Sequence, residues 1–312
     1  MFSSKKWSPE GLHVYITGGS QGLGLALAKL VARKGAHVSI VARTQSKLDD
    51  ALKELEANRQ SPDQVFKAFS FSLNTAEESA AALQAASDAH SGKVPDAVFA
   101  CAGAAKPMYL LEMQPEDLSR GMANGYWVQA WTAFAAAKQM VRENKKKGKI
   151  VLVSSTLGYM SLIGYSSYSP AKHALRGLAD SLHSELMLYG IDTHIFFPPT
   201  MYTPGFEEEN KTKPAITRTI ESTDEGLTAD QAAAGLLAGV EKGHAHITAD
   251  LITSLFRAST RGCAPRSNAA LDFVLDLVAH VGIPIWRRSV DKQVLAHRVE
   301  HREYLRSKGL VD

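Results

Sequence analysis

Short apolar runs alternate with longer amphipathic stretches from Leu12 to about residue 250. The runs have the length of buried β-strands, and the stretches between them carry apolar residues at helical spacing. This alternation is typical of right-handed βαβ units whose parallel sheet is covered on both faces. The sequence therefore predicts a doubly wound α/β fold. Predicted strands lie within 13–19, 36–43, 66–73, 96–103, 149–155 and 192–199, and the first two predicted helices lie within 23–35 and 46–58.

Two further patterns follow near the end of this region. The segment 218–243 has apolar residues at helical spacing after Thr228, which we expect to be a helix N-cap. His244 and His246 then lie two residues apart in a strand-like stretch. No third ligand accompanies them in the sequence, so we interpret both as core or edge histidines and expect no metal in the site.

The chain divides into a main domain and a C-terminal extension. No internal repeat or low-complexity linker interrupts residues 10–250, so we assign residues 1–255 to one domain and residues 256–312 to the extension. The part from Arg257 onward has ten Lys and Arg against six Asp and Glu, whereas the whole chain has a net charge of +3. The positive charge is concentrated in the extension, and the overall charge is too small to indicate a nucleic-acid partner.

The most apolar part of the extension is AALDFVLDLVAHVGIPIWRR, residues 269–288. Its longest uncharged stretch has ten residues, whereas a membrane-spanning helix needs roughly twenty. On a helix, Asp272 and Asp276 fall on one side and leave an apolar set largely on the other. We expect Gly282 and Pro284 to end this helix. The apolar set is Phe273, Val274, Leu277, Val278 and Val281, and Trp286, Arg287 and Arg288 follow it.

Two interpretations of this segment stay open. An amphipathic helix with an aromatic and basic edge suits the headgroup region of a membrane, which favours a membrane-facing extension that lies on the surface rather than a span. The alternative is a helix that packs on the main domain or on a second subunit.

Composition narrows the cellular setting. The chain has 312 residues, 45% of them hydrophobic, which suffices for a large core and excludes disorder throughout. Its two cysteines, Cys101 and Cys263, are far apart, so neither a disulfide framework nor a Cys-based metal site is indicated. The N-terminus MFSSKKWSPEG lacks the apolar core of a signal peptide. We therefore expect the catalytic part to lie in a reducing compartment.

The first predicted strand runs into TGGSQGLG, residues 17–24, which opens the first predicted helix. Glycines here allow a tight turn and let the backbone approach a pyrophosphate at the positive end of the helix. The spacing is glycine, three residues, glycine, one residue, glycine, and its place at this turn favours a dinucleotide site over a plain helix-capping turn. The expected cofactor contacts in this segment are Thr17, Gly18, Ser20, Gln21, Gly22, Leu23 and Gly24.

The end of the second predicted strand indicates which dinucleotide binds. An acidic residue there would bond the ribose 2′-hydroxyl, whereas a basic residue would neutralise a 2′-phosphate. The sequence has Ala42 and Arg43, with no carboxylate before Asp49. NADPH is the better match, with Arg43 and Ser20 as phosphate contacts. Lys47 is either a further contact or a solvated helix residue.

Tyr168 and Lys172 are four residues apart in YSPAK, one helical turn, so their side chains share a face. Reduction of a ketone by a nicotinamide leaves negative charge on the carbonyl oxygen, which a nearby acid should protonate. A tyrosine has an ordinary pKa of about 10, and we expect the ammonium of Lys172 to lower it. Ser155 lies at the carboxyl end of the predicted strand 149–155 and would donate a hydrogen bond to the substrate oxygen, with Ser154 on the opposite face of that strand.

These residues resemble the short-chain dehydrogenase/reductase family over about residues 10–250, since Ser155 stands thirteen residues before Tyr168 and the glycine turn is in place. The resemblance implies a Rossmann-type fold and catalysis by Ser155, Tyr168, Lys172 and Asn124, with Asn124 supporting a proton relay to Lys172. It implies that Lys172 also holds the nicotinamide ribose. The further cofactor contacts that it implies are Ala102, Gly103, Pro198 and Thr203, together with Tyr168 and Lys172.

A narrower resemblance, to the 3-ketodihydrosphingosine reductases, rests on residues 203–220, TPGFEEENKTKPAITRTI, and on SYSPAKHALRGLADSL. It implies NADPH-dependent reduction of 3-ketodihydrosphingosine, an amino ketone with an alkyl chain of about fifteen methylenes that resides in membrane. We expect one of Glu207, Glu208 and Glu209 to sense the amine, or all three to be a solvated lid. The resemblance implies the cytosolic face of the endoplasmic reticulum membrane and a homodimer or homotetramer.

Two other functions stay open. The same catalytic residues could reduce another lipophilic carbonyl, such as a steroid or a retinoid. A nucleotide-binding protein without turnover is the other alternative, and the intact set of Ser155, Tyr168 and Lys172 argues against it.

Overall fold

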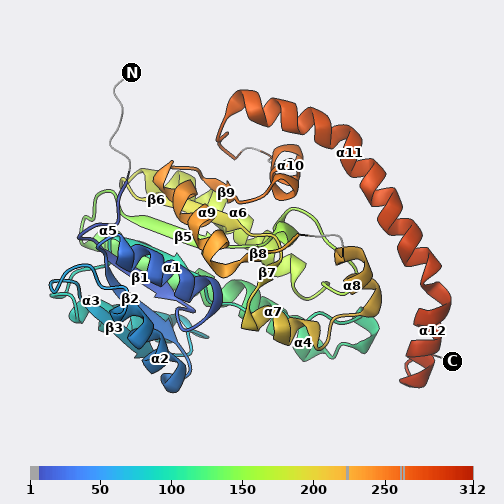
Figure 1. Cartoon of the computed structure of the whole chain (residues 1–312), viewed down its shortest axis with the longest axis horizontal. Coiled ribbons are helices and arrows are strands. Elements are labelled where there is room, and N and C mark those ends of the chain that lie inside the picture. The colour runs from blue at the N-terminus through green and yellow to red at the C-terminus, as the bar shows by residue number, and fades with distance from the viewer. Residues whose placement is uncertain (1–6, 223–224, 261, 263, 312) are drawn as a thin grey trace.

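The computed structural model describes residues 7–222, 225–260, 262 and 264–311. Its centre is a seven-stranded parallel sheet in the order β3-β2-β1-β4-β5-β6-β9 (Figure 1). The order reverses between β1 and β4, which places a crevice at the carboxyl ends of these two strands. The strands are β1 (His13–Thr17), β2 (His37–Ala42), β3 (Phe66–Ser70), β4 (Ala97–Ala100), β5 (Lys149–Val153), β6 (Asp192–Phe197) and β9 (His246–Thr248).

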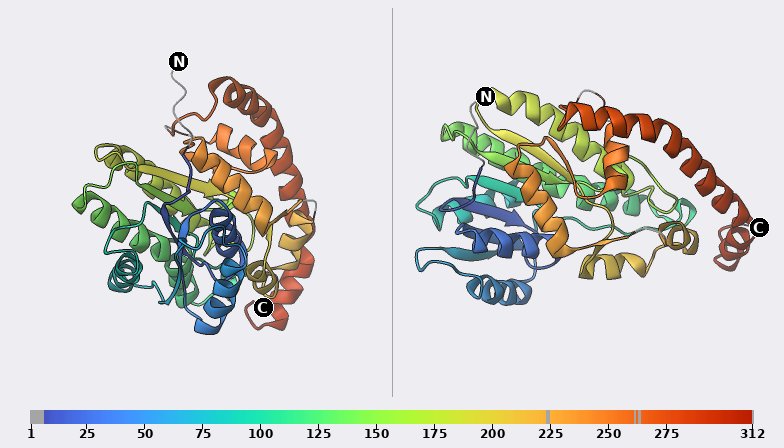
Figure 2. Two further views of the ribbon diagram at one scale, coloured as in Figure 1. Left: turned by 60° about the vertical axis from the view of Figure 1, so that its left-hand side comes forward. Right: turned by 45° about the horizontal axis from the view of Figure 1, so that its top comes forward.

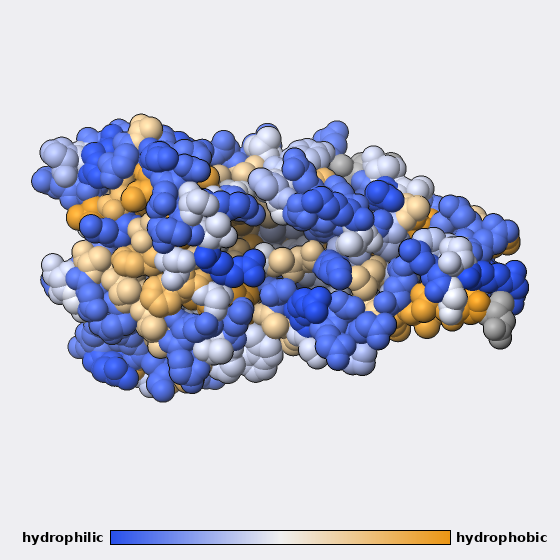
Figure 3. Space-filling view, turned by 90° about the horizontal axis from the view of Figure 1, so that it is seen from below, coloured by the Kyte–Doolittle hydropathy of each residue, from blue (hydrophilic) through white to orange (hydrophobic). Residues whose placement is uncertain are grey.

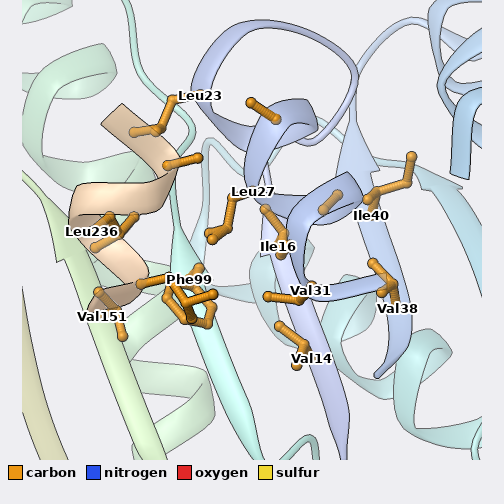
Figure 4. Close-up of a cluster of buried hydrophobic side chains, with 14 of the residues drawn as sticks. Val14, Ile16, Leu23, Leu27, Val31, Val38, Ile40, Phe99, Val151 and Leu236 are labelled. Atoms are coloured by element: carbon orange, nitrogen blue, oxygen red, sulfur yellow. The ribbon is translucent and has the colours of Figure 1, made fainter. Parts of the chain in front are cut away.

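Helices cover both faces of this sheet. One face packs against α1 (Gly22–Arg33), α2 (Gln45–Glu56) and α9 (Ala229–Glu241), and the other packs against α3 (Ala76–Asp88), α5 (Val128–Arg142) and α6 (Ser169–Met187). Along β1, Val14 and Ile16 join the first core while Tyr15 joins the second, as strand alternation requires. Figure 4 shows the first core, where Leu27 and Val31 of α1 meet β1. The predicted doubly wound fold is confirmed.

Smaller elements surround the carboxyl ends of the strands. A π-helical segment, η2 (Ala123–Trp127), joins α4 (Pro115–Met122) to α5, and a 3₁₀ turn, η3 (Thr156–Gly158), follows β5. Two short helices, α7 (Pro204–Asn210) and α8 (Ala215–Glu221), follow the strand β7 (Met201–Tyr202), which pairs with β8 (Leu227–Thr228). Another short turn, η1 (Leu110–Glu112), precedes α4. Thr228 caps α9, since its side chain accepts a hydrogen bond from the main chain of Gln231, as predicted.

Three helices form the C-terminal part: α10 (Leu251–Ser259), α11 (Ala269–Ala296) and α12 (Arg298–Ser307). Residue 255, where we placed the end of the main domain, lies inside α10. Helix α11 arcs from α10 past α8 along one side of the molecule (Figures 1 and 2). The prediction that Gly282 and Pro284 end this helix is wrong, because α11 continues through both residues. Leu275 and Ala279 before Pro284, and Val290 after it, are buried on the main body, and this packing holds the helix on both sides of the proline.

The two sides of α11 have different surroundings. The buried side carries Asp272, whose carboxylate forms an ion pair with Arg257 of α10, with N–O distances of 2.5 and 3.1 Å. Asp276, which we expected beside it, is exposed. The predicted apolar set is exposed, with 67% of Phe273 accessible to solvent. Helix α11 thus packs on the main domain, as the second interpretation predicts, and also presents an exposed apolar face. Hydrophobic atoms line one side of the projecting C-terminal helices in Figure 3.

Candidate active site

One large cavity, about 1290 Å³ in volume, lies at the carboxyl ends of the strands. Its wall includes every predicted catalytic residue and all the predicted cofactor contacts except Thr17. Thr17 is fully buried, and its hydroxyl accepts a hydrogen bond of 3.1 Å from the main-chain N–H of Ala102. It therefore ties the end of β1 to the segment after β4. The predicted residues that line the cavity are Gly18, Ser20, Gln21, Gly22, Leu23, Gly24, Arg43, Lys47, Ala102, Gly103, Asn124, Ser155, Tyr168, Lys172, Pro198 and Thr203.

The glycine turn is shaped to receive a phosphate group. Gly18 has a φ of +66°, and a Cβ there would lie 3.0 Å from the backbone of Ala102. A Cβ on Gly24 would lie 2.3 Å from the Gly18 carbonyl oxygen, so only glycine permits this close approach of helix and turn. Gln21 precedes α1 without a side-chain cap. The first N–H groups of α1 therefore stay available to an anion in the cavity.

The end of β2 supplies positive charge to the same cavity. Arg43 and Lys47 are exposed and line it, together with Thr44. The Lys47 ammonium donates a hydrogen bond of 3.0 Å to the side-chain oxygen of Gln21, which places it beside the glycine turn. Between β2 and β3 the residues that line the cavity are Arg43, Thr44 and Lys47, and none of them is a carboxylate. These residues fit a dinucleotide with a phosphate on its ribose.

Tyr168 and Lys172 meet as predicted. Tyr168 immediately precedes α6, and the main-chain N–H of Lys172 donates to its carbonyl over 3.2 Å. The Lys172 Nζ lies 5.3 Å from the centre of the Tyr168 ring and donates a hydrogen bond of 2.9 Å to the Val153 carbonyl. Ser155 hydrogen-bonds to the Tyr168 hydroxyl, while the Ser154 hydroxyl points the other way and donates to the Lys172 carbonyl.

Burial governs the acid–base character of this pair. It lowers the pKa of Lys172 to about 7. It also raises the pKa of Tyr168, as does the nearby carboxylate of Glu209, whereas the hydrogen bond with Ser155 lowers that pKa. We had expected Lys172 to lower the pKa of Tyr168, and the net direction is the opposite because desolvation disfavours both charged forms. A raised pKa keeps the phenol protonated near neutrality, which a proton donor requires.

Asn124 lies in the π-helical segment η2, a feature often found at functional sites. A Cβ on Gly103 would be 3.2 Å from the Asn124 carbonyl oxygen and 3.8 Å from the Lys172 Nζ, so these three residues converge. Gln129 supports them in a way that the sequence did not predict. Its amide nitrogen donates to the Val153 carbonyl over 2.8 Å and its oxygen accepts from the Val153 N–H over 2.9 Å, which fixes the carbonyl that Lys172 binds.

A second charged group lies beside Tyr168. Lys213, whose side chain is only 1% exposed, lies 3.1 Å from Glu209 and 2.6 Å from Glu221. The hydroxyl of Tyr165 is 2.5 Å from Glu209 and 2.9 Å from Glu221 and donates to these carboxylates. The rings of Tyr165 and Tyr168 have centres 6.0 Å apart. Glu209 and Glu221, which line the cavity, thus share one ammonium, that of Lys213.

The three consecutive glutamates of α7 have different environments. Glu209 is partly buried in the charged group, Glu208 lines the cavity but is exposed and pairs with Lys211, and Glu207 is exposed. The sequence could not separate them, because Glu221 reaches the pair of Glu209 and Lys213 only through the packing of α8. Thr203 caps α7, its hydroxyl accepting from the main chain of Phe206.

His246, one of the two histidines of the strand-like stretch, is held by two side chains. The two ring nitrogens of His246 hydrogen-bond to Tyr159 and to Asp180, at 2.9 and 2.7 Å. Within the described ranges, no group of three or more metal-binding side chains is present. Burial raises the pKa of Cys101 to about 12, so this thiol is not a nucleophile near neutrality. Cys263 lies outside the described residues.

Known proteins resemble the chain over most of its length. The model of the family described as short chain dehydrogenase matches residues 12–214. The 3-ketodihydrosphingosine reductase TSC10 of Cryptococcus neoformans is 42% identical over 308 residues, which cover 99% of this chain and 91% of that protein. The protein of the same name from Yarrowia lipolytica is 34% identical over 301 residues, 95% and 80% of the two chains. A solved short-chain dehydrogenase from Sphingobium yanoikuyae, in complex with NADPH, shares the fold with a TM-score of 0.65 at 22% identity, over 76% of this chain and 87% of that one.

Proposed function

The chain belongs to the short-chain dehydrogenase family, and we propose that it is an NADPH-dependent reductase that converts 3-ketodihydrosphingosine to sphinganine in sphingolipid synthesis. The observation that carries this proposal is the identity of 42% to a reductase of that name over 99% of the chain. Ser155, Tyr168 and Lys172 converge in one cavity with the glycine turn, so the chemistry that the proposal needs has its residues in place.

In the proposed reaction NADPH, when bound, supplies the hydride. Ser155 donates a hydrogen bond to the ketone oxygen and positions it against Tyr168. Tyr168 gives its proton to that oxygen as negative charge develops there. Lys172 would hold the ribose hydroxyls of the cofactor and, with Asn124, would return a proton to the phenol.

The residues of the cavity wall favour NADPH over NADH. The glycine turn and the open N-terminus of α1 would hold the pyrophosphate. Arg43 would neutralise the 2′-phosphate, with Ser20 and Lys47 beside it. The residues that line the cavity between β2 and β3 include no carboxylate, so the partner that a free 2′-hydroxyl would need is missing there.

The ammonium of the substrate would lie near Glu209. It is attached to the carbon next to the ketone, so it must lie close to Tyr168 when the ketone is in place. The pair Glu209 and Glu221 carries one more negative charge than Lys213 neutralises. Among the three glutamates of α7, we therefore assign amine recognition to Glu209.

We place the enzyme at the cytosolic face of the endoplasmic reticulum membrane, with the exposed apolar face of α11 toward the lipid. Among the described residues α11 is the one helix long and apolar enough to cross a membrane. Its other side packs on the main domain through Asp272, Leu275 and Ala279, which favours a helix that lies on the surface. Exposed Trp127 at the end of η2 and exposed Phe134 of α5 favour pairing of two copies through this region, as a homodimer or homotetramer.

The test is consumption of NADPH with 3-ketodihydrosphingosine, with a steroid ketone and with neither. We expect turnover with the sphingoid ketone, little with the steroid, and a loss of about 10²- to 10⁴-fold in Tyr168→Phe. Equal turnover of the steroid would point to a broader carbonyl reductase. A wild-type protein that binds NADPH but reduces neither ketone would contradict the proposal.

A further inference from the structure

The cavity does not end at the reacting groups. The hydroxyls of Thr156 and Thr253 are 2.7 Å apart, which brings the first turn of α10 against the residue that follows Ser155. Asp250 fixes the start of α10, since its carboxylate accepts from the Thr253 N–H over 2.8 Å. The part of the cavity wall that α10 supplies therefore begins next to Ser155, whose hydroxyl would bind the ketone.

Helices α10 and α11 are held together as two fixed walls. Arg257 and Asp272 form a buried bidentate ion pair between them. The rings of Phe256 and Trp286 meet edge to face with centres 5.4 Å apart. This part of the wall is largely apolar. Its lining residues are Leu251, Ile252, Thr253, Leu255 and Phe256 from α10, and Val278, Ala279, Gly282, Ile283 and Trp286 from α11.

Four of these residues mark the place where the cavity reaches the surface. Leu251, Ile252, Val278 and Gly282 both line the cavity and are exposed to solvent. We call these four residues the mouth. The exposed side chains of Leu277, Val281 and Ile285 on α11 adjoin it. The mouth thus opens onto an apolar surface, which is unfavourable in water and favourable in lipid.

We infer that the alkyl chain of the substrate lies between α10 and α11, with its far end leaving through the mouth toward the apolar face of α11. This inference rests on the proposed function, which supplies a ligand with a polar head and a long saturated chain. The head has its partners at Ser155, Tyr168 and Glu209, and the apolar wall starts next to them. The two ends of the cavity thus match the two ends of the substrate.

Gly282→Phe tests this inference. A Cβ on Gly282 would meet nothing within 4 Å, so the backbone accepts a side chain there, and a larger residue would occupy the mouth. The assay compares 3-ketodihydrosphingosine with a homologue shortened to about six carbons, which should not reach the mouth. We expect kcat/KM of the variant to fall about tenfold or more for the long ketone and to stay unchanged for the short one. Leu255→Trp, on the opposite wall, should act in the same way.

Ser289→Phe is the matched control. It adds the same ring two turns further along α11, at an exposed position that lies outside the cavity wall and away from the mouth, so neither substrate should be affected. The inference is overturned if Gly282→Phe and Leu255→Trp each change kcat/KM by the same factor for the long and the short ketone. This holds whether the variants keep or lose activity. A wild-type enzyme that reduces neither ketone overturns the proposed function and this inference with it. A wild-type enzyme that reduces both ketones, with variants that spare only the short one, supports both.

Discussion

At the residue scale, the active site depends on how burial and hydrogen bonds set the charge of a few side chains. Lys172 and Tyr168 are both buried, and burial moves both away from their charged forms. Gln129 then fixes the carbonyl that receives the Lys172 ammonium. Each of these residues has a separate, measurable effect.

The pKa of Lys172 predicts the pH dependence of the reaction. Burial lowers it to about 7, so the ammonium is present below that pH and is lost above it, whereas an unperturbed lysine would stay charged to about pH 10. We therefore expect kcat/KM with NADPH as the varied substrate, which reports the free enzyme, to fall as the pH rises above about 7. A profile that stays flat from pH 6 to 9 would contradict this. Binding of NADPH measured by fluorescence at each pH separates affinity from chemistry.

Arg43 should decide between the two nicotinamide cofactors. Arg43→Ala removes the side chain that would bond the 2′-phosphate, and a hydrogen bond to a charged group is worth about 1.5–3 kcal/mol. We expect kcat/KM for NADPH to fall about 10- to 100-fold while the value for NADH changes little. Lys47→Ala is the control and should cost less, because Lys47 is already bonded to Gln21. An equal loss with both cofactors would show that Arg43 does not contact the phosphate.

Glu209 should affect the KM only of substrates that carry an amine. Glu209→Gln removes one of the two carboxylates, and an opposite charge about 4 Å away is worth on the order of 1–4 kcal/mol. We expect the KM of the amino ketone to rise about tenfold, with no rise for an analogue that has a hydroxyl in place of the amine. Glu207→Gln, on the same helix but exposed, should leave both values unchanged. A similar rise for both substrates in Glu209→Gln would indicate a role in packing.

At the scale of elements, the ion pair between Arg257 and Asp272 joins α10 to α11. Asp272→Asn leaves the buried guanidinium without its opposite charge, and removal of one partner of such a pair costs about 3–5 kcal/mol. We expect a lower melting temperature and faster proteolysis near α11. Asp276→Asn, one turn along and exposed, should change neither. Unchanged melting in Asp272→Asn would mean that this pair does not hold α11 in place.

The elements also show what the pattern of neighbouring residues can and cannot predict. The strands, the glycine turn and the one-turn spacing of Tyr168 and Lys172 depend on residues close together in the chain, and the sequence predicted them. The end of α11 did not follow from Gly282 and Pro284, because burial on both sides of the proline outweighs the lost hydrogen bond. Likewise, the partner of Asp272 is Arg257, in another helix. Glu209 differs from Glu207 through Lys213, four residues on, and through Glu221 of α8. Contacts between different helices therefore decide these cases.

At the scale of the whole molecule, the exposed apolar set of α11 should bind the enzyme to lipid. We expect the wild-type protein to float with anionic liposomes and the double variant Leu277→Asp/Val281→Asp to stay in solution, because the charges would have to enter the apolar layer. Both positions are exposed, so the melting temperature should not change. Ser289→Asp, which adds a charge to an exposed polar position of the same helix, should still float. Wild-type protein that remains in solution would contradict membrane association.

The position of the mouth has a kinetic consequence. A lipid that enters between Val278 and Ile252 need not pass through water, so its relevant concentration is its share of the membrane area rather than its amount per litre. Added inert phospholipid would then slow the reaction at constant total ketone, as in surface dilution. Flux through the enzyme would follow the composition of the bilayer on which it sits.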